Sequence, residues 1–238
     1  MVAMLVSGIT VQVVRKPIKN LHLSVYPPDG HVRVAVPKLL SDDNVRLAVI
    51  SRLSWIKKQQ ANFQSQPRQS TREMVTGESH YLFGKRYRLE VIERRGCHEI
   101  AITNNTTLQL FVNPGTSTLN RALVLNQWYR NQLKVQIPAL LNRWQLTIGK
   151  EVQDWGIKKM KTKWGSCNIT EQRIWLNLEL AKKPLECLEY VIVHELVHLH
   201  ERHHNKRFKT YMDRYLPQWH RCRDILNREP LSNENWFC

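Results

Sequence analysis

Val191-Ile-Val-His-Glu-Leu-Val-His-Leu-His200 is the stretch that decides how the last third of the chain folds. Its apolar residues predict a helix that is buried on most of its surface. His194 and His198 stand four residues apart, which places both imidazoles on one face of that helix, where they can bind one zinc ion. Glu195 lies about 100° around the helix axis. It is thus close to the metal without being a ligand, as suits a general base acting on metal-bound water.

The apolar surroundings of this motif support a metal site. The flanking and embedded apolar residues are Leu188, Val191, Ile192, Leu196, Val197 and Leu199. A buried helix that carries two histidines and a glutamate needs polar partners for all three. One zinc ion satisfies them together, whereas the alternative is two core histidines that hydrogen-bond to neighbouring groups.

A catalytic zinc usually has a third protein ligand, for which four histidines compete. They are His200, His203, His204 and His220. His204 follows His198 by six residues, the interval of H-E-x-x-H-x-x-G-x-x-H sites, and we expect it to be the third ligand. We expect His200 and His203 at the surface or beside the ligands, and His220 on a separate segment.

The chain must leave the helix for His204 to reach the metal. Six residues of unbroken helix would turn His204 by about 240°, so we expect the helix to end near Arg202. Asn205 tolerates left-handed geometry and is expected to help the turn. Glu201 stands where the six-residue pattern has glycine, so the turn must differ locally from that pattern.

Four blocks of the chain, in this order and spacing, resemble the YgjP-like metallopeptidase family. They are Lys163-Trp-Gly-Ser-Cys-Asn168, Arg173-Ile-Trp-Leu-Asn177, Tyr190-Val-Ile-Val-His-Glu-Leu-Val-His-Leu199 and His204-Asn-Lys-Arg-Phe208. Weaker matches extend the resemblance over most of the chain: Arg15-Lys-Pro-Ile-Lys-Asn-Leu-His-Leu23, Pro27-Pro-Asp-Gly30 and Arg52-Leu-Ser-Trp-Ile-Lys57. The resemblance implies zinc on His194, His198 and His204, with Glu195 as the catalytic base. Around the site the chain is also similar to SprT-like and minimal zincin proteases.

Length and composition indicate a globular protein of 238 residues, 42% of them hydrophobic. We interpret residues 1–238 as a single YgjP-like metallopeptidase domain of the α+β class. Residues 1–116 form a β-rich half with antiparallel strands and one helix at 43–63. Residues 117–238 form the helical, zincin-like half that carries the H-E-x-x-H helix. We find no internal repeat and no low-complexity linker.

Period-two alternation predicts the first strands at 9–13, 21–25 and 32–36, arranged as an antiparallel meander. Residues 1–9 are interpreted as the approach to the first of them. Ser41 is expected to cap the following helix. Its apolar stripe is Val45, Val49, Leu53 and Ile56.

The middle of the chain is predicted to begin with a mobile connection at 64–79, a candidate lid. Further strands are expected at 87–91, 99–103 and 108–112. A long helix should run from Ser117 to about Trp144, with a bend at Pro138.

In the last third, residues 159–164 alternate lysines with larger groups, and we expect a half-exposed strand paired with 173–177. This strand is our candidate edge for an extended substrate, and an ordinary hairpin with solvated lysines is the alternative. Pro184 should open the metal helix. The helix that follows the site should pack against it through its apolar face, formed by Phe208, Tyr211, Met212 and Tyr215.

The net charge is +16, of which +7 lies in residues 1–75 and only +3 in residues 151–238. A basic surface that associates with polyanions without specificity explains it most simply. A nucleic-acid tether and a funnel for a phosphorylated small substrate are the sharper alternatives. No signature of sequence-specific DNA binding is present.

Five cysteines, an odd number without a C-x-x-C pair, argue against a disulfide framework and favour a reducing cytoplasm. They are Cys97, Cys167, Cys187, Cys222 and Cys238. Cys167 is interpreted as a buried structural thiol rather than a ligand. No apolar run approaches eighteen residues, so we expect no membrane span.

The function predicted from these residues is hydrolysis of a polypeptide substrate by zinc-activated water, with Glu195 as general base. Arg173, Lys163 and Tyr211 are candidates for stabilising the oxyanion. One alternative is hydrolysis of a phosphoanhydride, as in a nucleoside triphosphate, by the same metal centre. Another is a non-enzymatic, zinc-stabilised adaptor that binds nucleic acid.

Overall fold

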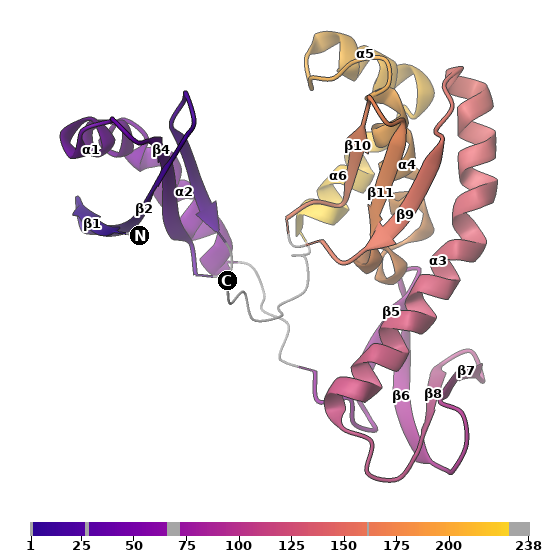
Figure 1. Cartoon of the computed structure of the whole chain (residues 1–238). Helices are drawn as coiled ribbons and strands as arrows, with labels where there is room; N and C mark the ends of the chain where they lie inside the picture. The colour runs from indigo at the N-terminus through magenta and orange to yellow at the C-terminus, as the bar shows by residue number, and fades with distance from the viewer. Residues whose placement is uncertain (1, 27–28, 66–71, 161, 229–238) are drawn as a thin grey trace. The chain divides into compact units, whose positions relative to one another are not determined.

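The computed structural model describes residues 2–26, 29–65, 72–160 and 162–228 (Figure 1), with the side chains of 62–65 left aside. The chain divides into two compact units, Met1–Gln69 and Ser70–Ser232. Strands dominate the amino-terminal part and helices the carboxy-terminal part, which confirms the α+β class. Among the described residues, no helix has the length and apolarity to span a bilayer.

The first unit is a four-stranded sheet with two helices on one face. Its strands are β1 (Val2–Val6), β2 (Ile9–Lys16), β3 (His22–Tyr26) and β4 (His31–Pro37), in the order β1-β2-β4-β3. The expected antiparallel meander is wrong, because β2 and β4 pair in parallel and β3 lies at the edge. Residues 2–6 form a strand in their own right, paired with β2 through the turn at Ser7 and Gly8.

Two helices, α1 (Asp42–Ile50) and α2 (Leu53–Ser65), replace the single helix expected at 43–63. The Ser51 hydroxyl donates to the Ala48 carbonyl oxygen at 3.0 Å, and such a bond competes with the helical backbone pattern. Ser41 caps α1 as expected, by accepting the Asn44 N–H. The core joins both helices to the sheet through Val45, Val49, Ile56 and the buried valines of the strands.

The second unit begins with another four-stranded sheet. It consists of β5 (Ser79–Leu82), β6 (Lys85–Glu93), β7 (Glu99–Thr103) and β8 (Thr107–Val112), in the order β5-β6-β8-β7. The three strands expected here are present. As in the first unit, the central pair β6 and β8 is parallel and the outer pairs are antiparallel.

Helix α3 (Thr118–Ile148) extends past the expected end at Trp144 and contains Pro138. The Ser117 hydroxyl caps its start, and Gly149 ends it with a φ of 71°, which glycine adopts without steric cost. Its buried stripe runs from Leu125 to Ile148. Figure 1 shows α3 passing along β5–β8 and continuing beside α4, so one helix joins this sheet to the metal-binding part.

The two units repeat one supersecondary arrangement at a constant offset of 76 residues, so the expectation of no internal repeat is wrong. In the first hairpin turn of the first repeat, φ is 48° at Ser7 and 80° at Gly8. In the corresponding turn of the second repeat, φ is 46° at Phe83 and 80° at Gly84. The serine caps Ser41 and Ser117 keep the same interval. So do the buried pairs Val6 and Leu82, Val11 and Tyr87, Val13 and Leu89, Val32 and Leu108, Val34 and Leu110, Val36 and Val112, and Val49 and Leu125.

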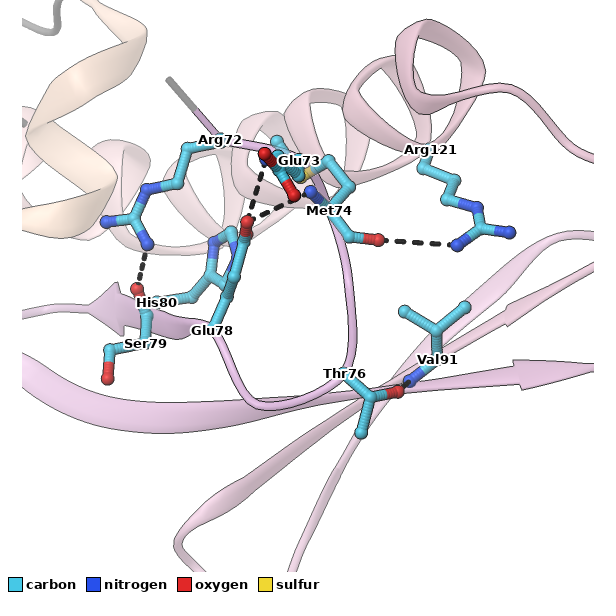
Figure 2. Close-up of polar contacts among 9 residues, drawn as sticks. All are labelled: Arg72, Glu73, Met74, Thr76, Glu78, Ser79, His80, Val91 and Arg121. Carbon is cyan, nitrogen blue, oxygen red and sulfur yellow. Dashed lines mark hydrogen bonds and ion pairs between the residues drawn. The ribbon is translucent and has the colours of Figure 1, made fainter. Parts of the chain in front are cut away.

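Of the mobile connection expected at 64–79, residues 64–65 belong to α2 and residues 72–79 are held in place by hydrogen bonds (Figure 2). Glu78 Oε1 accepts the backbone N–H groups of Glu73 and Met74 at 2.7 and 3.2 Å. Thr76 Oγ1 accepts the Val91 N–H at 2.9 Å, and Arg121 donates to the Met74 carbonyl oxygen. These residues are thus fixed to β6 and α3, and residues 66–71 lie outside the described chain.

The part of the second unit that carries the three expected histidine ligands combines a three-stranded sheet with short helices. Its elements are β9 (Asp154–Lys158), β10 (Gly165–Asn168), β11 (Arg173–Asn177), the 3-10 helix η1 (Leu178–Lys182), α4 (Leu185–Val197), α5 (Lys206–Tyr215) and α6 (Trp219–Arg228). The sheet order is β10-β11-β9. The strand expected at 159–164 is wrong: its described residues connect β9 to β10, and β10 and β9 are the two edge strands.

Asn177 explains why the 159–164 segment is not a strand. This fully buried side chain donates to the carbonyl oxygens of Met160 and Lys163 at 2.8 and 2.7 Å. Its Oδ1 accepts the N–H groups of Met160 and Glu179 at 3.3 and 3.2 Å. The amide thereby satisfies backbone groups that a strand would use in pairing, and it holds the connection over the start of η1.

The hairpin turn of the second repeat supports the start of α4. The Phe83 N–H donates to the Ala181 carbonyl oxygen at 2.8 Å. Gly84 has a φ of 80°, and a Cβ there would lie 3.0 Å from Pro184 Cγ, closer than most Cβ contacts, so glycine favours this approach. Pro184 immediately precedes α4, as expected, and the repeat therefore positions the amino end of the metal helix.

Candidate metal centre

The three expected ligands converge in the structure. His204 Nε2 lies 2.9 Å from His194 Nε2 and 3.1 Å from His198 Nε2. Among the described residues, these three side chains form a cluster that could hold a metal ion, with their ligand atoms within 4.8 Å of one another. Zinc–nitrogen bonds of about 2.0–2.1 Å at tetrahedral angles separate two ligand nitrogens by about 3.3 Å, which is close to these spacings.

His204 reaches the cluster because α4 ends at Val197, with His198 as its C-cap. The helix therefore ends earlier than the expected position near Arg202. Residues 198–200 form a turn, and the chain then returns to the other two histidines. The left-handed role expected of Asn205 is wrong, because its φ is −83° and its side chain caps α5 by accepting the Phe208 N–H at 3.0 Å.

Phe208 forms the apolar support of the three imidazoles. Its buried ring lies 4.9, 4.8 and 4.7 Å from the rings of His194, His198 and His204, measured between centroids. Because α5 begins directly after Asn205, one short segment supplies both the third histidine and the ring behind all three. Such packing restricts the histidine rotamers before any ion binds.

The hydrogen bonds of the histidines leave nitrogen lone pairs for a metal. His198 Nδ1 donates to the Glu201 carbonyl oxygen at 3.1 Å, which fixes the tautomer with a free lone pair on Nε2. Burial lowers the pKa of His194 to about 3 and also lowers the pKa of His198 and His204, so the neutral, ligating forms predominate. Three neutral imidazoles whose Nε2 atoms face one another have too few protons to satisfy all of them, and a bound cation removes this conflict.

Glu195 lies beside the cluster and is 5% exposed. Burial raises the pKa of its carboxyl group to about 8, and the nearby Lys163 ammonium opposes this rise. A Cβ at Gly165 would lie 2.5 Å from Glu195 Oε1 and 2.8 Å from Val191 Cγ1. The β10 backbone therefore packs directly on the carboxylate, and glycine is required at this position.

A cavity of about 1100 Å³ opens in front of the histidines. Its lining comes from the β10 segment, α4, the turn after α4, and α6. Besides the three histidines and Glu195, the residues that matter for chemistry are Lys163, Tyr190, Arg202 and Arg223. The whole of β10 lies along its wall, so the edge of the three-stranded sheet faces the metal cluster.

The three other histidines considered as the third ligand make different contacts. His200 lines the cavity, but its Nε2 lies 3.0 Å from the Ile148 carbonyl oxygen and its ring stacks on Tyr211. His203 is exposed, and its backbone N–H bonds to Glu201. His220 stacks on Trp219 in α6. All three lie outside the cluster, in agreement with the sequence expectation.

The three residues expected as candidates for stabilising the oxyanion differ in whether they line the cavity. Arg173 pairs with Asp154 and Glu171 at 2.9 and 3.2 Å and does not line the cavity. Tyr211 packs on His200 and is likewise outside the lining. Of the three candidates, Lys163 alone reaches the cavity.

Cys167 also differs from its expected role, because it is half-buried and lines the cavity instead of being fully buried. Burial raises the pKa of its thiol to about 11, so it is a neutral thiol and a poor ligand. The four described cysteines are free.

Sequence reasoning missed Tyr190 and the arginines of the cavity wall. Tyr190 precedes His194 by four residues and so shares its helix face, a signal that the sequence contained. Its ring meets His194 edge-on at 5.7 Å and stacks on Trp219, and burial raises its pKa to about 12. Arg223 comes from a helix remote in sequence and had no local signal.

The fold and the site together have the arrangement of a metal-dependent hydrolase. The model of the YgjP-like, metallopeptidase domain family matches residues 19–229, and the chain therefore belongs to the YgjP-like metallopeptidase family. It is a metallopeptidase by this membership, and the family implies a divalent metal. No curated protein matches the chain.

Two solved structures are similar to part of the chain. One is the metallopeptidase zymogen abylysin of Pyrococcus abyssi, with 21% identity and a TM-score of 0.34 over 38% of this chain and 89% of that one. The other is the metallopeptidase zymogen jannalysin of Methanocaldococcus jannaschii, with 26% identity and a TM-score of 0.33 over 37% of this chain and 88% of that one.

Proposed function

We propose that this metallopeptidase is zinc-dependent, with His194, His198 and His204 as the metal ligands and Glu195 as the general base. The observation that carries the proposal is the convergence of three Nε2 atoms beside a buried carboxylate at the wall of one cavity. Zinc bound there would polarise the scissile carbonyl group and acidify a water molecule. A structural zinc site normally uses four protein ligands, so the three-histidine cluster favours catalysis over the adaptor alternative.

In this proposal, Glu195 is the group that transfers protons. Its carboxylate accepts a proton from the attacking water and then returns it to the leaving amine. The carboxylate lies against the β10 backbone at Gly165, which limits the rotamers open to it. A dication beside it favours the charged form and so opposes the effect of burial on its pKa.

The substrate in this proposal is a polypeptide in an extended conformation that pairs with the β10 edge. β10 bonds to β11 on one side, and its residues line the cavity on the other. Main-chain hydrogen bonds along such an edge orient a peptide without selecting its side chains. Tyr190 and Lys163 both line the cavity and offer neutral and charged donors, respectively, for the oxyanion.

A second candidate function is hydrolysis of the phosphoanhydride of a nucleoside triphosphate. The observation that favours it is the basic lining of the cavity, where Lys163, Arg202 and Arg223 are opposed by a single acidic residue, Glu195. Arg223, however, also bonds to Asp224 at 3.0 Å, and Arg202 is exposed. The whole of β10 lies along the cavity wall and offers an edge to an extended peptide, so the peptidase remains our conclusion.

We also propose a cytoplasmic location, because the free thiols suit a reducing compartment.

The test compares wild type, Glu195→Gln and His203→Ala, each loaded with zinc, on unfolded casein and on each nucleoside triphosphate. We expect peptide cleavage by wild type and His203→Ala, and a loss of at least about a hundredfold in Glu195→Gln, since an amide cannot accept the proton. Zinc content should be equal in all three. Glu195-dependent release of phosphate or pyrophosphate without peptide cleavage would replace the peptidase by the second candidate.

A further inference from the structure

The first unit has an open sheet face that the metal centre does not use. Helices α1 and α2 cover the opposite face, which carries the buried valines. Strand alternation and register place nine side chains of the central strands and of β3 on the open face. They are Gln12, Val14, Lys16, His22, Ser24, Tyr26, His31, Arg33 and Ala35.

This face contains cations and no acidic residue. Residues 1–69 include ten lysines and arginines and three aspartates. Asp29 lies in the connection between β3 and β4, and Asp42 and Asp43 lie in the first turn of α1. Within the described chain, no acidic side chain pairs with Arg33 or Lys16, so the positive charge of this face is not neutralised locally.

Two flat rings lie beside the arginine. Tyr26 and His31 are register partners across β3 and β4, and their rings stack with centroids 5.0 Å apart and planes 14° apart. Arg33 follows His31 by two residues on the same strand and pairs with Ser24 and Gln12 of the neighbouring strands. The half-buried Tyr26 and Arg33 thus form a platform of rings and a guanidinium in the middle of the sheet.

The second repeat supplies an internal comparison, because its sheet has the same strand order and a different open face. Gln109 occupies the place of Arg33 by the repeat offset, donates to Glu90 at 2.8 Å and accepts from Thr103 at 2.9 Å. Glu99 on the β7 edge pairs with Arg94 at 2.7 Å. On the open face of the second sheet, Glu90 and Glu99 are thus each bonded to a neighbouring side chain, whereas the open face of the first sheet carries cations and no acidic residue.

We propose that the open face of the β1–β4 sheet binds single-stranded nucleic acid. Arg33 and Lys16 contact phosphates, and the Tyr26–His31 pair stacks with a base. Four-stranded sheets with exposed rings and cations bind RNA in this manner, and base stacking on rings is tolerant of sequence. An acidic peptide or an anionic membrane would use the cations but would leave the stacked rings without a role.

The experiment uses the full chain and fluorescein-labelled single-stranded RNA and DNA of twelve nucleotides, titrated by anisotropy at several salt concentrations. Arg33→Gln introduces the residue that the second repeat carries 76 positions later, Gln109. Tyr26→Thr introduces the residue type of Thr103, which faces Thr107 in register as Tyr26 faces His31. We expect Arg33→Gln to weaken binding about tenfold and to reduce the salt slope by about one. Tyr26→Thr should weaken binding about tenfold with little change in that slope.

Arg86→Gln on the exposed side of β6 is the matched control, and it should bind as wild type does. Arg33→Lys should retain the salt slope, and circular dichroism should show that every variant is folded. Binding of either RNA or DNA supports the proposal, and the stronger of the two identifies the natural ligand class. Three results would overturn the proposal. The wild type could fail to bind either RNA or DNA, or Arg86→Gln could weaken binding as much as Arg33→Gln does. The third is binding to heparin or phosphatidylserine vesicles that is as tight as binding to nucleic acid and is unchanged in Tyr26→Thr.

Discussion

Gly165→Ala tests the contact between the edge strand and the proposed base most directly. The added Cβ would lie 2.5 Å from Glu195 Oε1 and 2.8 Å from its Cγ, whereas ordinary contacts begin at 3.4 Å. The oxygen must therefore withdraw by about 0.9 Å and the Cγ by about 0.6 Å. Gly165 has no positive φ, so alanine fits the backbone conformation and the clash is the main perturbation.

A displacement of about 1 Å at a reacting group can reduce the rate by about a hundredfold, which is the loss of kcat/KM that we expect. Overpacking should also cost about 1–3 kcal/mol of unfolding free energy. Zinc content should stay at one ion per chain, because the clash is with Glu195 and Val191 rather than with a histidine. The assay is peptide cleavage together with metal analysis and thermal unfolding. Full activity in the folded variant, or loss of zinc together with activity, would refute the assignment of Gly165 to the positioning of Glu195.

Three further predictions concern metal binding, pH and the buried amide. His204→Ala should lose stoichiometric zinc, measured by mass spectrometry, because one of the three proposed ligands is removed. His203→Ala should retain the zinc. The reverse result would disprove the proposed ligand set. Burial and the neighbouring Arg72 lower the pKa of His80 to about 4, so the fold requires the neutral ring. The stability that His80 contributes is present above about pH 6.5 and is lost as the pH falls towards 4, by up to about 3 kcal/mol. Chemical denaturation from pH 7 to 4 should show this slope in wild type and a smaller one in His80→Met, and equal slopes would contradict it. Asn177→Ala should lower the free energy of unfolding by about 2–5 kcal/mol, since four backbone groups lose their partner, and an unchanged melting temperature would be incompatible with that role.

The strands and helices themselves were largely predictable, and their pairing was not. Alternation located most strands, and Ser41 and Ser117 cap helices as the sequence indicated. The parallel pairing of β2 with β4 escaped prediction, because alternation states which face of a strand is buried and not which strand lies beside it. The same limit led to the incorrect strand at 159–164, where the buried amide of Asn177 satisfies the backbone instead.

The internal repeat was invisible to sequence comparison for a related reason. The corresponding core positions share burial and not identity, as Val11 and Tyr87 or Val13 and Leu89 illustrate. What persists is backbone geometry, above all the positive φ at both residues of the first hairpin turn. Ser7 and Phe83 are poor indicators of that conformation by type, so the following glycines alone hinted at it.

The sequence by itself nominated His194, His198 and His204 for the candidate metal cluster, because local helical geometry and a six-residue interval are sufficient to single out these three. Only the tertiary structure decided how the cluster is supported. Phe208 behind the rings, the β10 backbone against Glu195, and Arg223 in the cavity wall all depend on contacts between segments distant in the chain. Such contacts arise from the packing of a whole core, which no local spacing specifies.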